Sequence, residues 1–224
     1  VGGKNANLGE MFQLGLRVPP GFAVTTHAFD TFIDRGRVRN KIVRTLSQIP
    51  SDNVPALEKA GQTVRDLIES TPIPEKIVKE IGQAYKKLCD LCGIPDLPVA
   101  VRSSATSEDL KTASFAGQHE SYLWVRGEEQ VIRHILKCWA SLFTDRAIAY
   151  RNQIGWPHDN VTISVGIQKM VKAKCAGVMF TINPVTGEQN LIVIEGNWGL
   201  GESVVSGAVT PDHFEIDKNT LKLI

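Results

Sequence analysis

Apolar residues recur every three or four positions through the first ninety residues, which is the pattern of amphipathic helices. We predict five helices here, punctuated by prolines, and one strand over residues 21–25. The last three helices are interpreted as packing elements without chemistry. The five stripes are Leu8, Met11, Phe12 and Gly15; Ala28, Phe29, Phe32 and Ile33; Val38, Ile42 and Leu46; Leu57, Val64, Leu67 and Ile68; and Ile77, Ile81, Tyr85 and Leu88.

The rest of the chain alternates between short apolar runs and two helical patterns. The last three strands are expected to form one largely antiparallel sheet, because turn residues separate them. The predicted strands cover residues 99–101, 121–125, 161–167, 175–181 and 191–195. The predicted helices carry the stripe Val131, Ile132, Ile135, Trp139, Leu142 and Phe143 and the segment 145–155.

These elements predict an α+β fold with two lobes. Residues 1–97 form a helix-rich first lobe, and residues 98–224 form a second lobe that contains an antiparallel sheet. Pro95 and Pro98 mark the boundary, since prolines punctuate the passage between elements.

Composition narrows the class of protein. The 224 residues are 42% hydrophobic, enough for a real core, and the net charge of +1 creates no strong field toward nucleic acid or membrane. Without a bilayer-length apolar run or a signal-peptide pattern, we expect a soluble, cytoplasmic protein. Because the chain starts at Val1 and stops in a strand-like run at residues 221–224, we expect a piece of a longer polypeptide.

The four cysteines do not suggest a disulfide scaffold. Cys89 and Cys92 form one CxxC pair, but a zinc site needs two further ligands and none is evident at a suitable spacing. The pair closes a helical pattern, whereas a redox motif opens a helix after a strand. We therefore interpret both thiols as structural.

A run of small hydroxyl residues follows Arg102 and favours anion binding. Ser103, Ser104, Thr106 and Ser107 offer hydroxyl and backbone N–H donors beside the planar guanidinium fork. The small residues at 113–117 then suit a loop that folds over a ligand. An ordinary polar surface loop remains the alternative.

Two further positions favour a ligand. Lys4 lies at a helix N-terminus behind two glycines, where the helix dipole and free N–H groups attract phosphate. The alternative is a solvated lysine at a helix start. The segment is not a Walker A loop, because the GxxxxGK[ST] spacing is absent. On the polar face of strand 161–167, Gly166 leaves room for a flat group, Gln168 offers a donor and an acceptor, and Met170 an apolar wall. A half-solvated strand is the alternative there.

The glycine-rich stretch 196–203 follows an apolar strand and invites a dinucleotide-binding interpretation, with Asp217 near the offset of a ribose-binding acid. This signal is weak, because Val204 replaces the third glycine and no parallel βαβ series surrounds the loop. Glu195 and Glu202 are candidate ligands or orienting groups, but loop carboxylates are usually inert.

Seven segments occur in the order seen in one enzyme family. They read VGGKNANLGEM, VPPGFAVTT, AVRSSATSEDL, ASFAGQHESYL, ASLFTDRAIAYR, GVMFTINPVTGE and WGLGESVVSGAVTPD. From Val1 to Asp217 the chain resembles the N-terminal nucleotide-binding part of phosphoenolpyruvate synthases (pyruvate, water dikinases). It is also similar to pyruvate phosphate dikinase, rifampin phosphotransferase and the small subunit of phenylphosphate synthase.

The resemblance implies an ATP-grasp-like architecture, in which ATP lies between two α+β lobes with Mg²⁺ on its phosphates. It implies that Lys4 and Arg102 contact phosphates and act in catalysis. By the same likeness, the remaining nucleotide-binding positions are Gly117 and Ser121 in the closing loop, and Gln168, Met170 and Val171 in the nucleotide pocket.

The resemblance also implies a reaction. A histidine on a separate phosphohistidine domain takes the β-phosphate with the γ-phosphate attached, water removes the terminal phosphate, and the remaining phosphoryl group passes to pyruvate on a third domain, with release of AMP. None of the five histidines matches the acceptor motif, and only His119 merits a test, although an exposed loop histidine is preferred. The acidic metal ligand is expected beyond Ile224, so residues 1–224 alone are expected to lack turnover.

Two alternative functions stay open. The first alternative is the ATP-binding part of a related phosphotransferase whose phosphoryl acceptor is rifampin or a phenol. Domains outside this chain would determine the acceptor. A non-catalytic nucleotide-sensing module is the second alternative.

Overall fold

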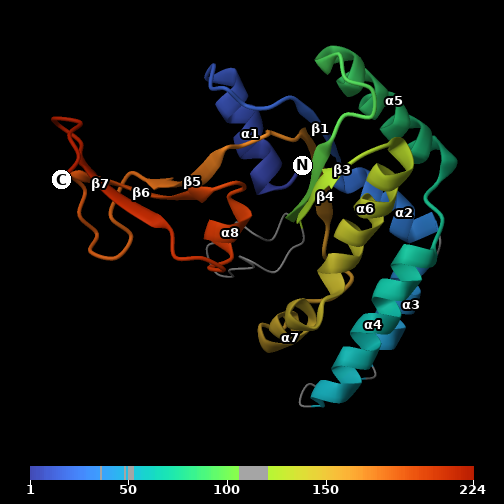
Figure 1. Cartoon of the computed structure of the whole chain (residues 1–224). Coiled ribbons are helices and arrows are strands. Elements are labelled where there is room, and N and C mark those ends of the chain that lie inside the picture. The colour runs from blue at the N-terminus through green and yellow to red at the C-terminus, as the bar shows by residue number, and fades with distance from the viewer. Residues whose placement is uncertain (36, 48, 50–52, 106–120) are drawn as a thin grey trace. The chain divides into compact units, whose positions relative to one another are not determined.

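The computed structural model divides into two compact units, Val1–Met170 and Val171–Ile224 (Figure 1). Helices accompany an antiparallel sheet in each unit, which confirms the predicted α+β class. The predicted lobe boundary at residues 97 and 98 lies inside the first unit, and the division into lobes 1–97 and 98–224 stays a prediction. The structure describes residues 1–35, 37–47, 49, 53–105 and 121–224.

The first unit is built on a four-stranded sheet in the order β1-β4-β2-β3, with every neighbouring pair antiparallel. β4 is central and pairs with β2 along its whole length, from Ile163 opposite Ala105 to Lys169 opposite Val99. The strands are β1 (Gly21–Val24), β2 (Val99–Ala105), β3 (Ser121–Val125) and β4 (Ile163–Lys169).

The predicted alternation in β4 is confirmed, but its polar face is not open to solvent. Ile163, Val165 and Ile167 belong to the hydrophobic core, as the pattern requires. On the opposite face Ser164 and Gly166 are buried as well. An ideal Cβ on Gly166 would lie 2.5 Å from the Asn5 side chain, so the space expected for a flat ligand at this glycine holds that amide.

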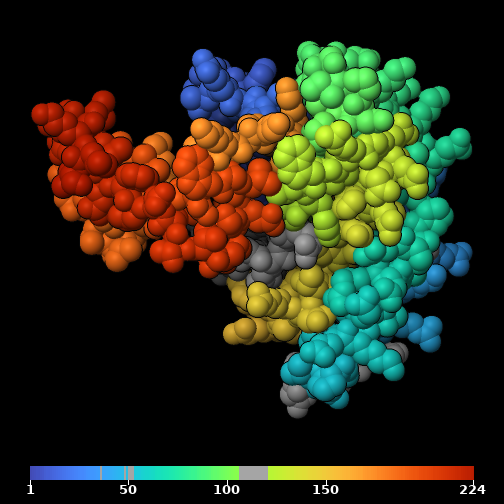
Figure 2. Space-filling view, viewed as in Figure 1, coloured from blue at the N-terminus to red at the C-terminus, as the bar shows by residue number. Residues whose placement is uncertain are grey.

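Helices α2 to α6 bury most of the stripes that the spacing predicts, including Val38, Ile42 and Leu46 and the Leu57 and Ile77 series. Helix α1 does not, because none of its residues is buried and Met11 and Phe12 of its predicted stripe are exposed. Helices α4, α5 and α6 contribute to the face of this unit seen in Figure 2. The helix bounds are α1 (Gly3–Gln13), α2 (Thr26–Arg35), α3 (Val38–Leu46), α4 (Val54–Ser70), α5 (Glu75–Cys92), α6 (Glu128–Ala140), the 3₁₀ turn η1 (Ser141–Phe143) and α7 (Asp145–Gln153).

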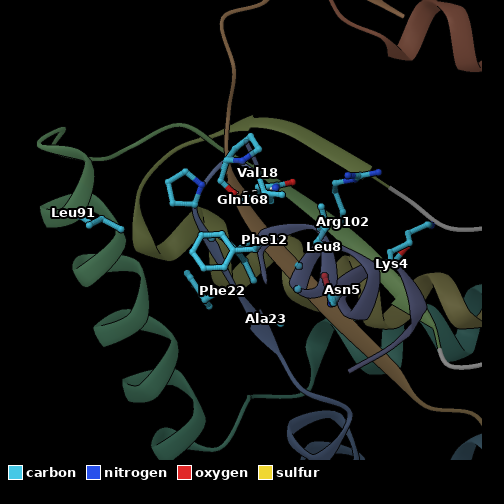
Figure 3. Close-up of a pocket in the computed structure, with 17 residues that line it drawn as sticks. Lys4, Asn5, Leu8, Phe12, Val18, Phe22, Ala23, Leu91, Arg102 and Gln168 are labelled. Carbon is cyan, nitrogen blue, oxygen red and sulfur yellow. Dashed lines mark hydrogen bonds between the residues drawn. The ribbon is translucent and has the colours of Figure 1, made fainter. Parts of the chain in front are cut away.

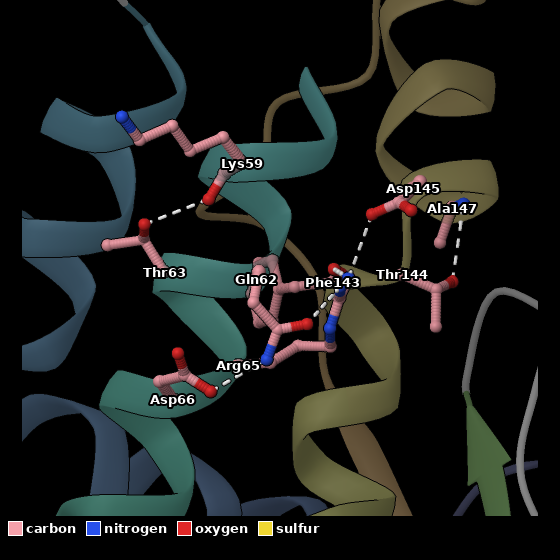
Figure 4. Close-up of polar contacts among 9 residues, drawn as sticks. All are labelled: Lys59, Gln62, Thr63, Arg65, Asp66, Phe143, Thr144, Asp145 and Ala147. Atoms are coloured by element: carbon pink, nitrogen blue, oxygen red, sulfur yellow. Dashed lines mark hydrogen bonds and ion pairs between the residues drawn. The ribbon is translucent and has the colours of Figure 1, made fainter. Parts of the chain in front are cut away.

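Polar contacts join α4 to the segment that begins α7 (Figure 4). The Arg65 guanidinium donates to the Phe143 carbonyl at 2.8 Å and to the Asp145 carboxylate at 2.9 Å. Thr144 caps α7, because its hydroxyl accepts from the Ala147 N–H. These contacts fix the turn between α6 and α7, whose apolar side chains lie in the core.

A buried arginine lies beside a neutral histidine after α7. Arg151 is 1% exposed, and its Nε donates to Nδ1 of His158 at 3.0 Å. Nε2 of His158 therefore carries the proton and donates to the Asn152 side-chain oxygen at 2.8 Å. Burial, followed by the charge of Arg151, lowers the pKa of His158 to about 4.

This histidine predicts acid sensitivity of the fold. Because the pKa of His158 is lower in the folded than in the unfolded chain, the unfolded chain binds the proton more tightly, and acid favours unfolding. The contribution of the neutral His158 ring to the free energy of unfolding is therefore complete above pH 6.5 and declines toward pH 4. We expect about 2 kcal/mol to be lost over that window, since the ring is only half-buried. Urea unfolding at several pH values should show that His158→Gln abolishes this loss, whereas the variant His27→Gln, at an exposed histidine, should keep it. An equal pH dependence of the unfolding free energy in the unmodified protein and both variants would contradict the assignment.

The second unit holds a smaller antiparallel sheet in the order β5-β6-β7. The expected sheet of strands 161–167, 175–181 and 191–195 is wrong, because β4 pairs with β1 and β2 while β5 and β6 join β7. The predicted turn after β5 is confirmed: the Asn183 side chain accepts from the N–H groups of Val185 and Thr186. The elements are β5 (Cys175–Phe180), β6 (Leu191–Trp198), α8 (Glu202–Val205) and β7 (Asp212–Asp217).

The surroundings of the glycine-rich loop argue against a dinucleotide site. The strands around it are antiparallel, and α8 after it is one turn long, so this unit provides no parallel βαβ motif. Asp217 accepts from the N–H and the hydroxyl of Thr220 at 2.7 and 2.8 Å, which closes the turn after β7. The hydrogen bonds from Thr220 hold the pKa of Asp217 below its ordinary value.

Candidate functional site

A cavity of about 420 Å³ opens in the first unit between α1, the N-terminal end of β1, the centre of the sheet and the end of α5 (Figure 3). This volume is in the range of small-molecule sites. Its lining comprises Lys4, Asn5, Leu8, Gly9, Phe12, Val18, Pro19, Pro20, Gly21, Phe22, Ala23, Leu91, Arg102, Ser103, Gly166, Ile167 and Gln168.

The cavity is polarised from one end to the other. Figure 3 shows Lys4 and Arg102 together on one side, and Phe12, Phe22 and Leu91 toward the other. A ligand that suits both ends combines an anionic group with a flat or apolar body.

Arg102 reaches the cavity because β2 exposes it. It is the one exposed residue of the strand, between Val101 and Ser103, which are buried. In the sheet Arg102 lies opposite Gly166 of β4 and Ser121 of β3. Arg102 and its partner Gly166 both line the cavity, and the Asn5 side chain lies against Gly166.

Lys4 lies in the first turn of α1, close against β2. Gly2, at the N-cap, has φ +73°, and an ideal Cβ there would lie 2.1 Å from the Ser104 carbonyl oxygen. Only glycine fits both the backbone and the space. The first turn of α1 contains no acidic residue, so the helix N-terminus and the ammonium both present positive charge.

Sequence comparison decides the family. A family described as the pyruvate phosphate dikinase AMP/ATP-binding domain matches residues 1–224. The chain belongs to this family. The predicted resemblance is thereby confirmed.

Curated relatives support the same placement of this AMP/ATP-binding domain. The chain is similar to a probable phosphoenolpyruvate synthase of Staphylothermus marinus, with 50% identity over 100% of this chain and 27% of the relative. It is 48% identical to the probable enzyme of Methanocaldococcus jannaschii, covering 19% of it, and 47% identical to the phosphoenolpyruvate synthase of Aeropyrum pernix, covering 27%. The chain thus spans about a quarter of the length of these relatives or less.

In this AMP/ATP-binding domain, Gln168 lines the cavity, and its predicted contact with a nucleotide stays a prediction. Its side-chain N–H donates to the Pro19 carbonyl at 3.1 Å, and the residue lies opposite Gly21 in the sheet. The amide therefore holds the segment before β1 against β4. That segment supplies Pro19 and Pro20 to the cavity lining.

Three other predicted nucleotide-binding residues, Met170, Val171 and Ser121, are described by the structure and do not line this cavity. Met170 is not part of the lining; its N–H donates to the Pro98 carbonyl at 2.9 Å. Val171, 54% exposed, begins the second unit. Ser121 is exposed at the start of β3, opposite Arg102. The predicted roles of Gly117 and His119 lie outside the described residues.

The remaining candidates are not among the residues that line the cavity. Cys89 and Cys92, at the end of α5, pack against the core. In the second unit Glu195 lies 3.7 Å from Nδ1 of His213, and Glu202 begins α8. Within the described ranges no three His, Cys, Asp or Glu side chains are grouped to hold a metal ion. None of the helices there is long and apolar enough to cross a membrane.

Asn5 is the cavity residue that the sequence reasoning missed. Its side chain donates to the Ser164 hydroxyl at 2.8 Å, which ties α1 to β4. A signal was present, because Asn5 shares a helix face with Leu8 and Phe12 and is the polar residue of that row. Its partner, 159 residues away, could not be read from local spacing.

Proposed function

We propose that this domain binds ATP in the cavity of the first unit, with the triphosphate at Lys4 and Arg102. The supporting observation is the convergence of these two cations, from α1 and β2, at one end of a cavity whose other end is apolar. The family description as an AMP/ATP-binding domain supports the choice of ligand.

The proposal includes an ATP-grasp-like closure of two lobes, 1–97 and 98–224, over the nucleotide. Gly117 and Ser121 would belong to the closing loop, and Gln168, Met170 and Val171 to the nucleotide pocket. In this scheme Arg102 provides a planar fork of donors for two phosphate oxygens, and Lys4 provides a point charge.

These side chains favour phosphoryl transfer by neutralising charge that is spread over the phosphate oxygens in the transition state. Lobe closure excludes water and aligns the attacking group. The proposed acceptor is a histidine on a separate phosphohistidine domain, from which the phosphoryl group passes to pyruvate. The names of the relatives, phosphoenolpyruvate synthases, favour pyruvate over an antibiotic or a phenol.

Among the described residues, the cavity lining contains no aspartate or glutamate, so these residues do not by themselves form a Mg²⁺ site. We propose that Mg²⁺ accompanies the nucleotide on its own phosphates, and that acidic ligands come from outside residues 1–224. The absence of turnover by residues 1–224 alone stays a prediction on the same ground.

Lys4→Met in the full-length protein tests the proposal. Loss of one charge-assisted contact to phosphate is expected to weaken ATP binding about 10- to 100-fold, measured by titration calorimetry with MgATP. Lys86→Met, on an exposed position of α5 outside the cavity, is the matched control and should bind as the unmodified protein does. Equal ATP affinity in all three proteins would contradict this phosphate site.

A further inference from the structure

Helix α1 is attached to the sheet in an unusual way. None of its 11 residues is buried, and Phe12 is 69% exposed. Helices of this length are marginal on their own and normally owe their stability to a packed apolar face. The helix that carries Lys4 therefore needs another form of support.

Polar contacts at its first turn provide that support. The Asn5 side-chain amide donates to the Ser164 hydroxyl at 2.8 Å and to the Val1 carbonyl at 3.2 Å. The backbone N–H of Asn5 donates to the Ser104 hydroxyl at 3.3 Å. Ser104 and Ser164 are 1% and 0% exposed, so solvent does not compete for these hydroxyls.

The Ser104 contact replaces a missing helix cap. The N-cap residue is Gly2, which has no side chain to accept from the first-turn N–H groups. Asn5 is the third residue of the helix, and its N–H is one that an N-cap side chain ordinarily satisfies. A serine on β2, 99 residues later, accepts from it instead.

Close packing locks this arrangement. A Cβ on Gly2 would lie 2.4 Å from the Ser104 hydroxyl, and a Cβ on Gly166 would lie 2.5 Å from the Asn5 side-chain oxygen. A side chain at Gly2 would push the helix end away from the β2 backbone, and one at Gly166 would displace the Asn5 amide.

Three members of this contact set lie next to, or within two residues of, one of the two cations, and Ser164 is the sheet partner of Ser104 and the acceptor for Asn5. Asn5 follows Lys4, Ser104 lies two residues along β2 from Arg102, and Gly166 is the sheet partner of Arg102. We propose that Gly2, Asn5, Ser104, Ser164 and Gly166 form a clamp that fixes the position of Lys4 relative to Arg102, with Asn5 as the positioning residue. This inference rests on the proposed role of the two cations in binding ATP.

Ser164→Ala in the full-length protein tests the clamp, because Ser164 does not line the cavity and its hydroxyl is the acceptor for Asn5. Hydrogen exchange without nucleotide should become faster in residues 3–13 and not in α6. ATP affinity should fall about 5-fold, the effect of one lost hydrogen bond. The control is Ser141→Ala, which removes another buried hydroxyl, bonded to the Cys138 carbonyl at 2.7 Å, from a residue that does not line the cavity.

A double-mutant cycle with Lys4→Met separates positioning from general destabilisation. If the clamp acts through Lys4, Ser164→Ala should change ATP affinity by less than about 2-fold once Lys4 is gone. An unchanged exchange rate in α1 overturns the clamp. If Ser164→Ala lowers ATP affinity 5-fold both with and without Lys4, the clamp does not position Lys4. The same conclusion follows if Ser164→Ala leaves ATP affinity unchanged while Lys4→Met binds ATP weakly. Faster exchange combined with normal ATP affinity of Lys4→Met overturns the proposed phosphate site instead.

Discussion

Arg102→Met in the full-length protein is expected to reduce kcat/KM for ATP by roughly 30- to 1,000-fold. This corresponds to about 2 to 4 kcal/mol of lost phosphate and transition-state interaction. The effect should exceed that of Lys4→Met, because a guanidinium binds two oxygens in a fixed geometry whereas an ammonium acts as a single point charge. Steady-state kinetics with varied MgATP measure it.

Two comparisons make the Arg102 result specific. Arg102→Lys keeps the charge and loses the fork, so it should recover only part of the activity. Arg126→Met removes an exposed arginine after β3, outside the cavity lining, and should have no effect. The fold should tolerate Arg102→Met, since an exposed position on β2 contributes little to stability. Wild-type kcat/KM in this variant would remove Arg102 from the site.

Trp139→Ala should produce the largest loss of stability, about 3 to 5 kcal/mol. Trp139 is 0% exposed, and its ring lies 5.8 Å from that of Phe29 and 4.8 Å from that of Phe32, measured between centroids. Truncation leaves a cavity where α2 and α6 meet the core. Urea unfolding followed by far-UV circular dichroism measures the change without depending on tryptophan fluorescence.

Trp139→Phe is the informative partner of that variant. The indole N–H of Trp139 is buried and has no hydrogen-bond partner among the described residues. Phenylalanine removes this unsatisfied donor, which offsets part of the lost volume, so we expect a change of less than about 1.5 kcal/mol. A loss from Trp139→Phe as large as that from Trp139→Ala would contradict this expectation, because it would show that the indole N–H stabilises the fold instead of being an unsatisfied donor.

The sequence predicted the buried faces of α2 to α6 well, because their burial follows a local period, but the apolar stripe of α1 is not buried. Stripes such as Val38, Ile42 and Leu46 could be assigned to the core from spacing alone. Strand positions were also predicted, yet strand partners were not. Alternation marks β4 as a strand but does not reveal that its neighbours are β1 and β2, which come earlier in the chain.

In the candidate site, too, residues with a local sequence signal were predicted, and residues whose role depends on distant partners were missed. Lys4 was recognisable from its helix start and, like Arg102, from family resemblance, and the structure brings both to one cavity. The strand end predicted at Arg102 was wrong, because β2 continues to Ala105 and Arg102 lies in its middle. Asn5 was missed because its importance depends on Ser104 and Ser164, which no local pattern connects to it. For the same reason, the sequence did not show that the Asn5 amide occupies the space expected beside Gly166, which nevertheless lines the cavity.

The remote cap on α1 has a consequence for the order of folding events. Contacts between residues 99 and 159 positions apart form late, since long loops must close before such contacts are made. A nascent chain that has not yet brought β2 and β4 together provides neither hydroxyl, and its first turn lacks both acceptors. Order at the N-terminus therefore reports completion of the sheet, and the lysine there reaches its place only in molecules that have finished folding.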